Sequence, residues 1–199
     1  MSGMTKTDLL LLGIENGAAF CAANGLPFPE VNARSRKDWH VSACAYYRPV
    51  KIEICSDACA AIGREGRAWS YPGYSVDRTP FGVVAHELGH HADYTRSQRR
   101  GPYFGDYSIR VRASACEQPL TSYCPNDAEW FAEMFRLFVT NPDLLRLIRP
   151  ATHELIAADF QPSITADWQT VIKDAPARTI AAAERKIDLA AAARRRRAA

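Results

Sequence analysis

The hydrophobic and polar residues follow two different periods in the first part of the chain. Over residues 5 to 24, leucine, phenylalanine and alanine recur at helical spacing until Asn24-Gly25 and two prolines end the pattern. Residues 39 to 55 are rich in aromatic and β-branched side chains, and the segment VKIEIC alternates with a period of two. We therefore predict a packing helix followed by a strand pair or hairpin, with one face formed by Val50, Ile52 and Ile54.

Two segments further along the chain have well-marked helix boundaries. Thr79 is a good N-cap and Pro80 suits the first helical turn, so a helix is expected from Pro80 onward. Asn126 or Asp127 caps a second helix, whose apolar side chains repeat at helical spacing until Asn141-Pro142 stops it. Strands mixed with helices in this way predict an α+β fold.

Between and beyond these elements the pattern is weaker. Residues 56 to 62 suit a short helix, and residues 69 to 80 predict an aromatic loop that could wall a site or merely cover the core. Residues 96 to 126 are polar and basic and predict a long loop. We expect one domain over residues 1 to 176 and an Ala/Arg-rich helix with a basic tail over residues 177 to 199.

Composition and charge narrow the class of protein. With 199 residues, 47% hydrophobic and 24% charged, the chain has the make-up of a soluble globular protein. The net charge of +3 is concentrated in the run Arg194 to Arg197, which is typical of a solvated tail and could also make a weak nucleic-acid contact. The apolar run Leu9 to Leu12 is far shorter than the ~20 residues of a membrane span, and is too short for a secretory signal. We expect a cytoplasmic protein, or one delivered by a non-classical route.

Six cysteines are many for such a chain: Cys21, Cys44, Cys55, Cys59, Cys116 and Cys124. Without a secretory signal, they are expected to be mostly reduced and buried. Two alternatives stay open. Cys55 and Cys59 could help to build a structural zinc site, or Cys116 and Cys124 could form a disulfide.

The segment TPFGVVAHELGHHADY, residues 79 to 94, carries the clearest chemistry. On a helix, His86 and His90 lie one turn apart on the same face, so both imidazoles can bind one metal ion. Glu87 is rotated by roughly 100° and would stand beside that ion. The pattern is the H-E-x-x-H of zinc hydrolases. The alternative is a buried helix with two hydrogen-bonded histidines. Under either interpretation, Gly89 lets another element approach closely.

A two-histidine site lacks a third ligand, and the second helix offers one. Glu129 and Glu133 lie four residues apart on a strongly apolar helix, where a buried carboxylate is costly unless it is paired or bound to a metal. A salt bridge from Glu133 to Arg136 would be one solution. In His₂Glu zinc enzymes, a glutamate from a following helix completes the coordination. His40, a lone histidine in the predicted strand region, is a weaker candidate ligand.

Two blocks of the chain together resemble the gluzincin zinc metallopeptidases. They are HELGHHAD, residues 86 to 93, and TSYCPNDAEWFAEMFRLF, residues 121 to 138. The likeness is strongest to the family of the anthrax lethal factor catalytic domain and related toxin and phage-borne peptidases. That family shows a similar H-E-x-G-H helix, a T-S-Y segment and an E-x-F-A-E-x-F helix. The resemblance implies a zincin-like α+β fold, with a small mixed sheet packed on the H-E-x-x-H helix and on the following glutamate helix.

The same resemblance implies roles for individual residues. His86, His90 and Glu129 would be the zinc ligands, and Glu87 the general base that takes a proton from the attacking water. Tyr123 would match the tyrosine that steadies the oxyanion or leaving group. The spacing from Tyr123 to the glutamate is one residue shorter here than in the family.

Two further acidic residues would support the site. Glu133 would orient one of the ligand histidines. Asp93 would do the same, or would compete with Glu129 as the third ligand.

Three functions stay open at this point. The first is a zinc metallopeptidase that hydrolyses a protein or peptide substrate. The second is a phage peptidase of the ImmA/IrrE type, which pairs H-E-x-G-H with a later glutamate helix and cleaves a repressor. The third is a non-catalytic module, with or without zinc, that binds a protein or nucleic acid through its basic loop and tail. The sequence leaves the substrate, its cleavage site and the oligomeric state open.

Overall fold

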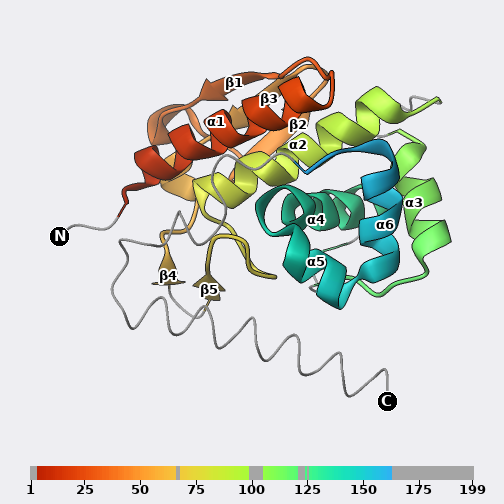
Figure 1. Ribbon diagram of the computed structural model, residues 1–199. Coiled ribbons are helices and arrows are strands. Elements are labelled where there is room, and N and C mark those ends of the chain that lie inside the picture. The colour runs from red at the N-terminus through yellow and green to blue at the C-terminus, as the bar shows by residue number, and fades with distance from the viewer. Residues whose placement is uncertain (1–3, 66–67, 99–104, 121–123, 125, 163–199) are drawn as a thin grey trace.

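The computed structural model describes residues 4–65, 68–98, 105–120, 124 and 126–162. This part of the chain forms a mixed α+β fold, as predicted (Figure 1). The helices are α1 Lys6–Ala23, α2 Pro80–Arg96, α3 Tyr107–Ala115, α4 Asp127–Thr140, α5 Pro142–Ile148 and α6 Pro150–Asp159. The strands are β1 Glu30–Ala33, β2 Ala45–Arg48, β3 Lys51–Ile54, β4 Gly63–Glu65 and β5 Ala68–Ser70, with short 3₁₀ turns η1 Arg36–Asp38 and η2 Ser56–Ala58.

Three strands form the larger sheet, in the order β1-β3-β2. β3 pairs in parallel with β1 and antiparallel with β2, which leaves β2 at an edge. The predicted hairpin is confirmed, and Ile52 and Ile54 are fully buried. Val50 does not share the face of Ile52 and Ile54 as predicted: it lies in the turn with φ 63° and is 59% exposed. Val50 follows Pro49 in the two-residue loop and takes the position at which a type II turn requires a positive φ, which removes it from the alternating pattern.

α1 and α2 lie side by side and pack against the larger sheet (Figure 1). α1 begins at Thr5, whose side chain and backbone form a reciprocal capping box with Asp8. Leu10 of α1 and Val84 of α2 then meet Ile54 of β3 in one buried cluster. The sheet therefore fixes α2 on one side, which leaves the other side of α2 for the helices that follow.

The rest of the core is helical and rich in phenylalanine. α4 packs on α2, and α3, α5 and α6 surround α4 (Figure 1). Phe135 of α4 lies edge-on to Phe20 of α1 and to Phe160, with ring centroids 5.3 Å apart in each pair. These contacts bury the apolar side chains of α4, whose helical spacing predicted this helix.

α2 and α4 cross in close contact at Gly89. A Cβ atom added there would lie 2.7 Å from the Cα of Ala132 and 3.2 Å from its carbonyl oxygen. The expectation that Gly89 admits a neighbouring element is therefore confirmed.

We expect a Gly89→Ala variant to be less stable by about 1–3 kcal/mol, because the added methyl group must push two packed backbones apart. The effect would run against helix propensity, since alanine is favoured over glycine by about 1 kcal/mol in an unconstrained helix. Urea unfolding measures the difference, with Glu15→Ala on the exposed face of α1 as control. Unchanged or higher stability of Gly89→Ala would contradict the close crossing.

Several parts of the fold differ from the prediction. β1, β4 and β5 were not expected, and the predicted short helix at residues 56 to 62 is only the turn η2. The predicted long loop contains α3. α3 has no side-chain N-cap bond, and its apolar positions do not form a clear stripe, so the helix signal is weak. Asn141 does end α4, and it also caps α5 by accepting a hydrogen bond from Leu144 N at 3.1 Å.

The predicted tail and the domain boundary near residue 176 lie outside the described residues. None of the helices in the described ranges has the length and apolar character needed to cross a membrane.

Candidate metal centre

α2 presents two histidines to α4. Thr79 caps the helix by accepting a hydrogen bond from Gly82 N at 3.3 Å, and Pro80 fills the first turn, as predicted. One turn apart on the same face, the rings of His86 and His90 lie edge-on with centroids 5.0 Å apart. Both rings are nearly buried.

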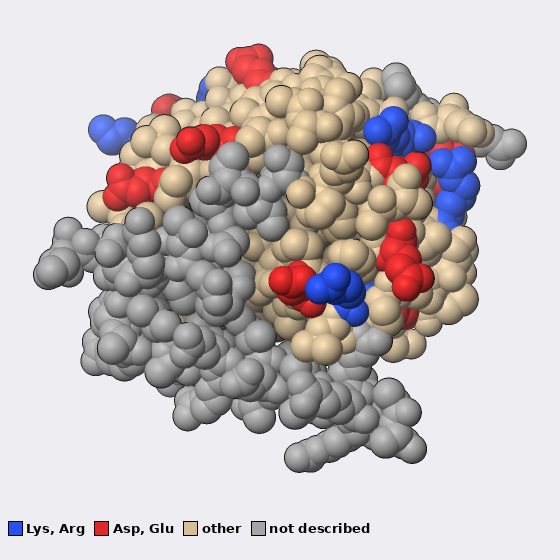
Figure 2. Space-filling view, viewed as in Figure 1, with Lys and Arg blue, Asp and Glu red and all other residues tan. Residues whose placement is uncertain are grey.

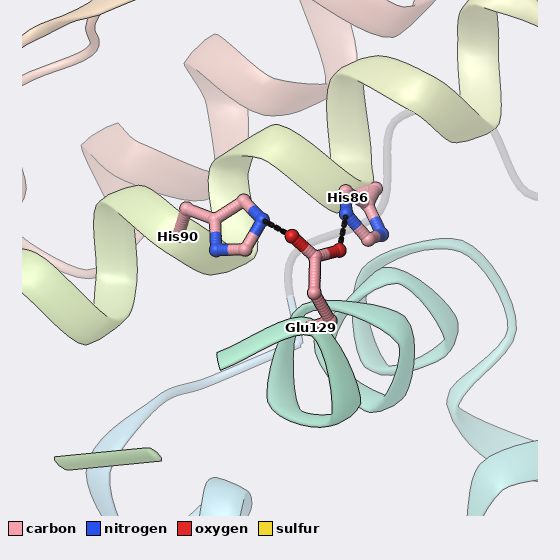
Figure 3. A group of neighbouring side chains, drawn as sticks. All are labelled: His86, His90 and Glu129. Carbon is pink, nitrogen blue, oxygen red and sulfur yellow. Dashed lines mark ion pairs between the residues drawn. The ribbon is translucent and has the colours of Figure 1, made fainter. Parts of the chain in front are cut away.

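α4 supplies a carboxylate to the same place. Asn126 caps this helix and accepts a hydrogen bond from Glu129 N at 3.0 Å, which fixes the first turn. The Glu129 side chain then points at both histidines (Figure 3). Its Oε2 lies 3.2 Å from His86 Nε2, and its Oε1 lies 3.5 Å from His90 Nε2.

These three residues could hold a metal ion, since one ligand atom from each lies within 4.8 Å of the others. Two ligands at ~2.05 Å from a tetrahedral ion are ~3.3 Å apart, close to both nitrogen–oxygen distances in the cluster. Glu129 Oε2 is also buried and accepts no well-aligned hydrogen bond from the described residues. The three side chains thus converge on one point, with Glu129 between the two imidazoles, as expected of a metal site.

Glu133 holds His86 from the other side of its ring. Glu133 Oε1 lies 2.8 Å from His86 Nδ1, so the ring donates through Nδ1 and turns Nε2 toward Glu129. Burial alone would lower the pKa of His86, but the carboxylates of Glu129 and Glu133 outweigh it and raise the pKa to about 10. A metal ion that binds at this cluster would have to displace the additional proton of the protonated His86 ring.

Arg136 completes the support for Glu133. Burial acts to raise the pKa of Glu133, but Arg136 and His86 hold it down at about 2. Both the predicted pairing with Arg136 and the predicted contact with a histidine are therefore present. Arg136 is itself fully buried and also donates to the carbonyl oxygens of Tyr74 at 2.8 Å and Ser75 at 3.2 Å. It thereby ties the loop before α2 to α4, a role that the sequence analysis missed.

Unlike His86 and His90, Glu87 contacts strand β2. Its carboxylate is buried and accepts a hydrogen bond from the backbone N–H of Tyr47 on β2. Burial raises the pKa of Glu87, although His86 and His90 oppose the shift. A carboxylate held in this way is a better proton acceptor near neutral pH than an exposed glutamate.

A cavity of about 390 Å³ lies beside Glu87. Its walls come from the segment at the start of β2, from the loop before α2, and from α2 and α4: Ser42, Ala43, Cys44, Ala45, Ser75, Val76, Asp77, Arg78, Val83, His86, Glu87 and Glu133. Four residues of the predicted aromatic loop line the cavity, but none of these four is aromatic. Its Tyr71, in contrast, is buried in the core.

Asp93 does not lie in the cluster, contrary to both roles suggested for it. Its Oδ1 accepts hydrogen bonds from Ser108 N at 2.8 Å and from Ser97 Oγ at 3.2 Å, and its Oδ2 accepts one from Gly105 N at 3.3 Å. These bonds join α2 to α3. The reason is its position along the helix, since Asp93 lies about one turn beyond His90, where Gly105 and Ser108 approach α2.

Two other predicted residues have different outcomes. His40 is exposed and is no member of the one metal-binding group found among the described residues. Tyr123 lies outside the described residues, so its role stays a prediction.

The predicted basic loop is used partly for internal contacts. Arg112 pairs with Asp127 at 2.8 Å, Arg96 lies over the ring of Phe160, and Arg110 lies over Tyr107. On the face seen in Figure 2, the basic and acidic side chains of the described residues are interspersed and do not gather into one basic patch. Nucleic-acid binding through the basic loop and tail stays a prediction, because the tail lies outside the described residues.

Comparisons with protein-family models, curated proteins and solved structures find no match to the chain. A proposal of function thus depends on the geometry and chemistry of the site itself.

Proposed function

We propose that this protein is a zinc-dependent metallopeptidase with a zincin-like, gluzincin-type site. The observation that carries the proposal is the convergence of Glu129 from α4 on His86 and His90 from α2, with Glu87 beside them in the cavity wall. Two histidines and one glutamate are a donor set of catalytic zinc sites, which keep a further position open. The resemblance of the two sequence blocks to gluzincins supports the same conclusion.

Each residue of the chain has a distinct part in hydrolysis. Bound zinc would supply a Lewis acid, which acidifies a water molecule and polarises the scissile carbonyl. Glu87 would accept a proton from the attacking water and return it to the leaving amine. The Tyr47 N–H fixes the Glu87 carboxylate, and Glu133 fixes the ring of His86. Preorganised groups of this kind lower the activation free energy of hydrolysis.

The edge strand β2 would bind an extended peptide. Cys55 N donates to Cys44 O at 3.0 Å, so the antiparallel ladder to β3 uses alternate residues of β2. The backbone groups of Ala45 then face away from β3, and Ala45 lines the cavity. A peptide that adds to this edge would pass beside Glu87.

Metal removal tests the proposal. We expect the purified protein to contain zinc and to cleave casein or a peptide library, and expect 1,10-phenanthroline to abolish cleavage and added zinc to restore it. Elemental analysis and product mass spectrometry measure both effects, while circular dichroism checks that the chelated protein is still folded. A protein that purifies without zinc and cannot be loaded with it would rule the hydrolase out.

A further inference from the structure

The cysteines differ sharply in their surroundings. All six are free, so the alternative of a Cys116–Cys124 disulfide is not realised. No cysteine belongs to a metal-binding group among the described residues, which also counts against the suggested second zinc site. Cys21 is buried, and burial raises the pKa of its thiol to about 12. Cys116 is exposed to solvent.

Cys44 is placed for reaction. It lines the cavity together with His86 and Glu87 and is only partly buried. The neighbouring thiol of Cys59 lowers the pKa of Cys44 to about 7, against the effects of burial and of the Glu87 carboxylate, and the positive charges of Arg78 and Lys6 add to the lowering. A thiolate stabilised by a hydrogen bond and by cations, and open to a cavity, is the reactive form of cysteine.

Cys59 belongs to a buried hydrophobic cluster against which Cys44 packs. It is 1% exposed, and its Sγ also approaches the carbonyl oxygen of Cys55 at 3.5 Å. The hydrogen bond to Cys44 and burial both raise the pKa of Cys59, so it stays protonated while Cys44 ionises. A reactive, accessible thiol next to a second protonated thiol is the arrangement of peroxide-sensing cysteine pairs.

We infer that Cys44 is a peroxide-sensitive modification site and that Cys59 is the thiol that resolves it. Cys44 releases its proton, and the thiolate attacks hydrogen peroxide. A sulfur–oxygen bond forms as the oxygen–oxygen bond breaks, and the hydroxide that leaves takes up the released proton to become water. The sulfur of Cys59 then attacks the Cys44 sulfur and displaces hydroxide, which takes the Cys59 proton and leaves as water. In sum, two thiols and one peroxide give one disulfide and two water molecules.

The modification would alter the cavity wall. The Cys44 sulfur already lies 3.3 Å from the carbonyl oxygen of Ala58 in η2, and a Cys44–Cys59 disulfide would hold it there. It also joins the start of β2 to that segment by a covalent bond. The effect on substrate binding rests on the proposed peptidase function, whereas the thiol chemistry does not.

Mass spectrometry of the full chain as purified tests the inference without any activity assay. Hydrogen peroxide is expected to remove two hydrogens from the protein mass, and peptide mapping is expected to locate the new bond between Cys44 and Cys59. With iodoacetamide near pH 7, Cys44 is expected to react at least ~10-fold faster than the buried Cys21. Dithiothreitol should reverse the mass loss.

Variants assign the two roles. Cys59→Ala is expected to stop the reaction at the sulfenic acid of Cys44, which the probe dimedone traps, and Cys44→Ser is expected to prevent the disulfide. Oxidation of Cys116 while Cys44 stays a free thiol would overturn the inference. So would a Cys44 that alkylates no faster than Cys21 in the unmodified protein, a result that does not depend on the folding of any variant.

Discussion

A Glu87→Gln variant is expected to keep its metal and to lose at least ~100-fold in hydrolytic rate, since a positioned general base contributes ~10²–10⁴-fold. Glutamine has the shape of glutamate and can still accept the hydrogen bond from Tyr47 N–H through its amide oxygen. It cannot take a proton from water. Because burial already disfavours the charged form of Glu87, the neutral side chain should not destabilise the fold.

The rate constant for cleavage of a fixed peptide, measured beside metal content, separates these effects. Glu154→Gln on the exposed side of α6 is a matched control, because it makes the same chemical change far from the cavity. A Glu87→Gln protein that cleaves within a few-fold of the wild type would show that Glu87 is not the base. Loss of metal in that variant would show instead that Glu87 supports the ion.

Glu129→Ala is expected to weaken metal binding by more than ~100-fold. Removing a group that merely supports a ligand costs ~10–100-fold in affinity, and the loss of a ligand should exceed that. The variant should remain folded, since Asn126 still caps α4 through a backbone N–H. Competition with a fluorescent zinc chelator measures the affinity directly.

Asp127→Ala in the same helical turn is the matched control, because Asp127 pairs with Arg112 outside the cluster. Asp93→Ala makes a second comparison. It should lower stability, because backbone N–H groups of Gly105 and Ser108 lose their acceptor, but it should leave metal affinity unchanged. Metal affinity that falls with Asp93→Ala and not with Glu129→Ala would reverse the assignment of the third ligand.

The parts of the site that could be predicted depend on short-range rules. Helical spacing alone places His86 and His90 on one face of a helix. The capping side chains of Thr79 and Asn126 predict where the two helices begin. Glu129 could be proposed because a carboxylate on so apolar a helix needs a partner. The structure brings it to the histidines.

The parts that could not be predicted depend on contacts between distant segments. The sequence pattern of residues 50 to 55 predicts strand β3 well but cannot show that its neighbour β2 forms the edge beside Glu87. β1 is too short and too polar to stand out, since only its pairing with β3 makes it a strand. Arg136 could be suspected of pairing with Glu133, but its bonds to two loop carbonyls follow from tertiary packing alone.

The crossing of α2 and α4 at Gly89 links metal binding to the stability of the folded protein. The two helices bring His86, His90 and Glu129 together only in the native fold, so an ion that binds there selects the folded chain over the unfolded one. At a free concentration ~1,000 times its dissociation constant, such an ion adds ~4 kcal/mol to stability, out of the ~5–15 kcal/mol typical of a domain. Metal supply would then set how much of the chain escapes proteolysis.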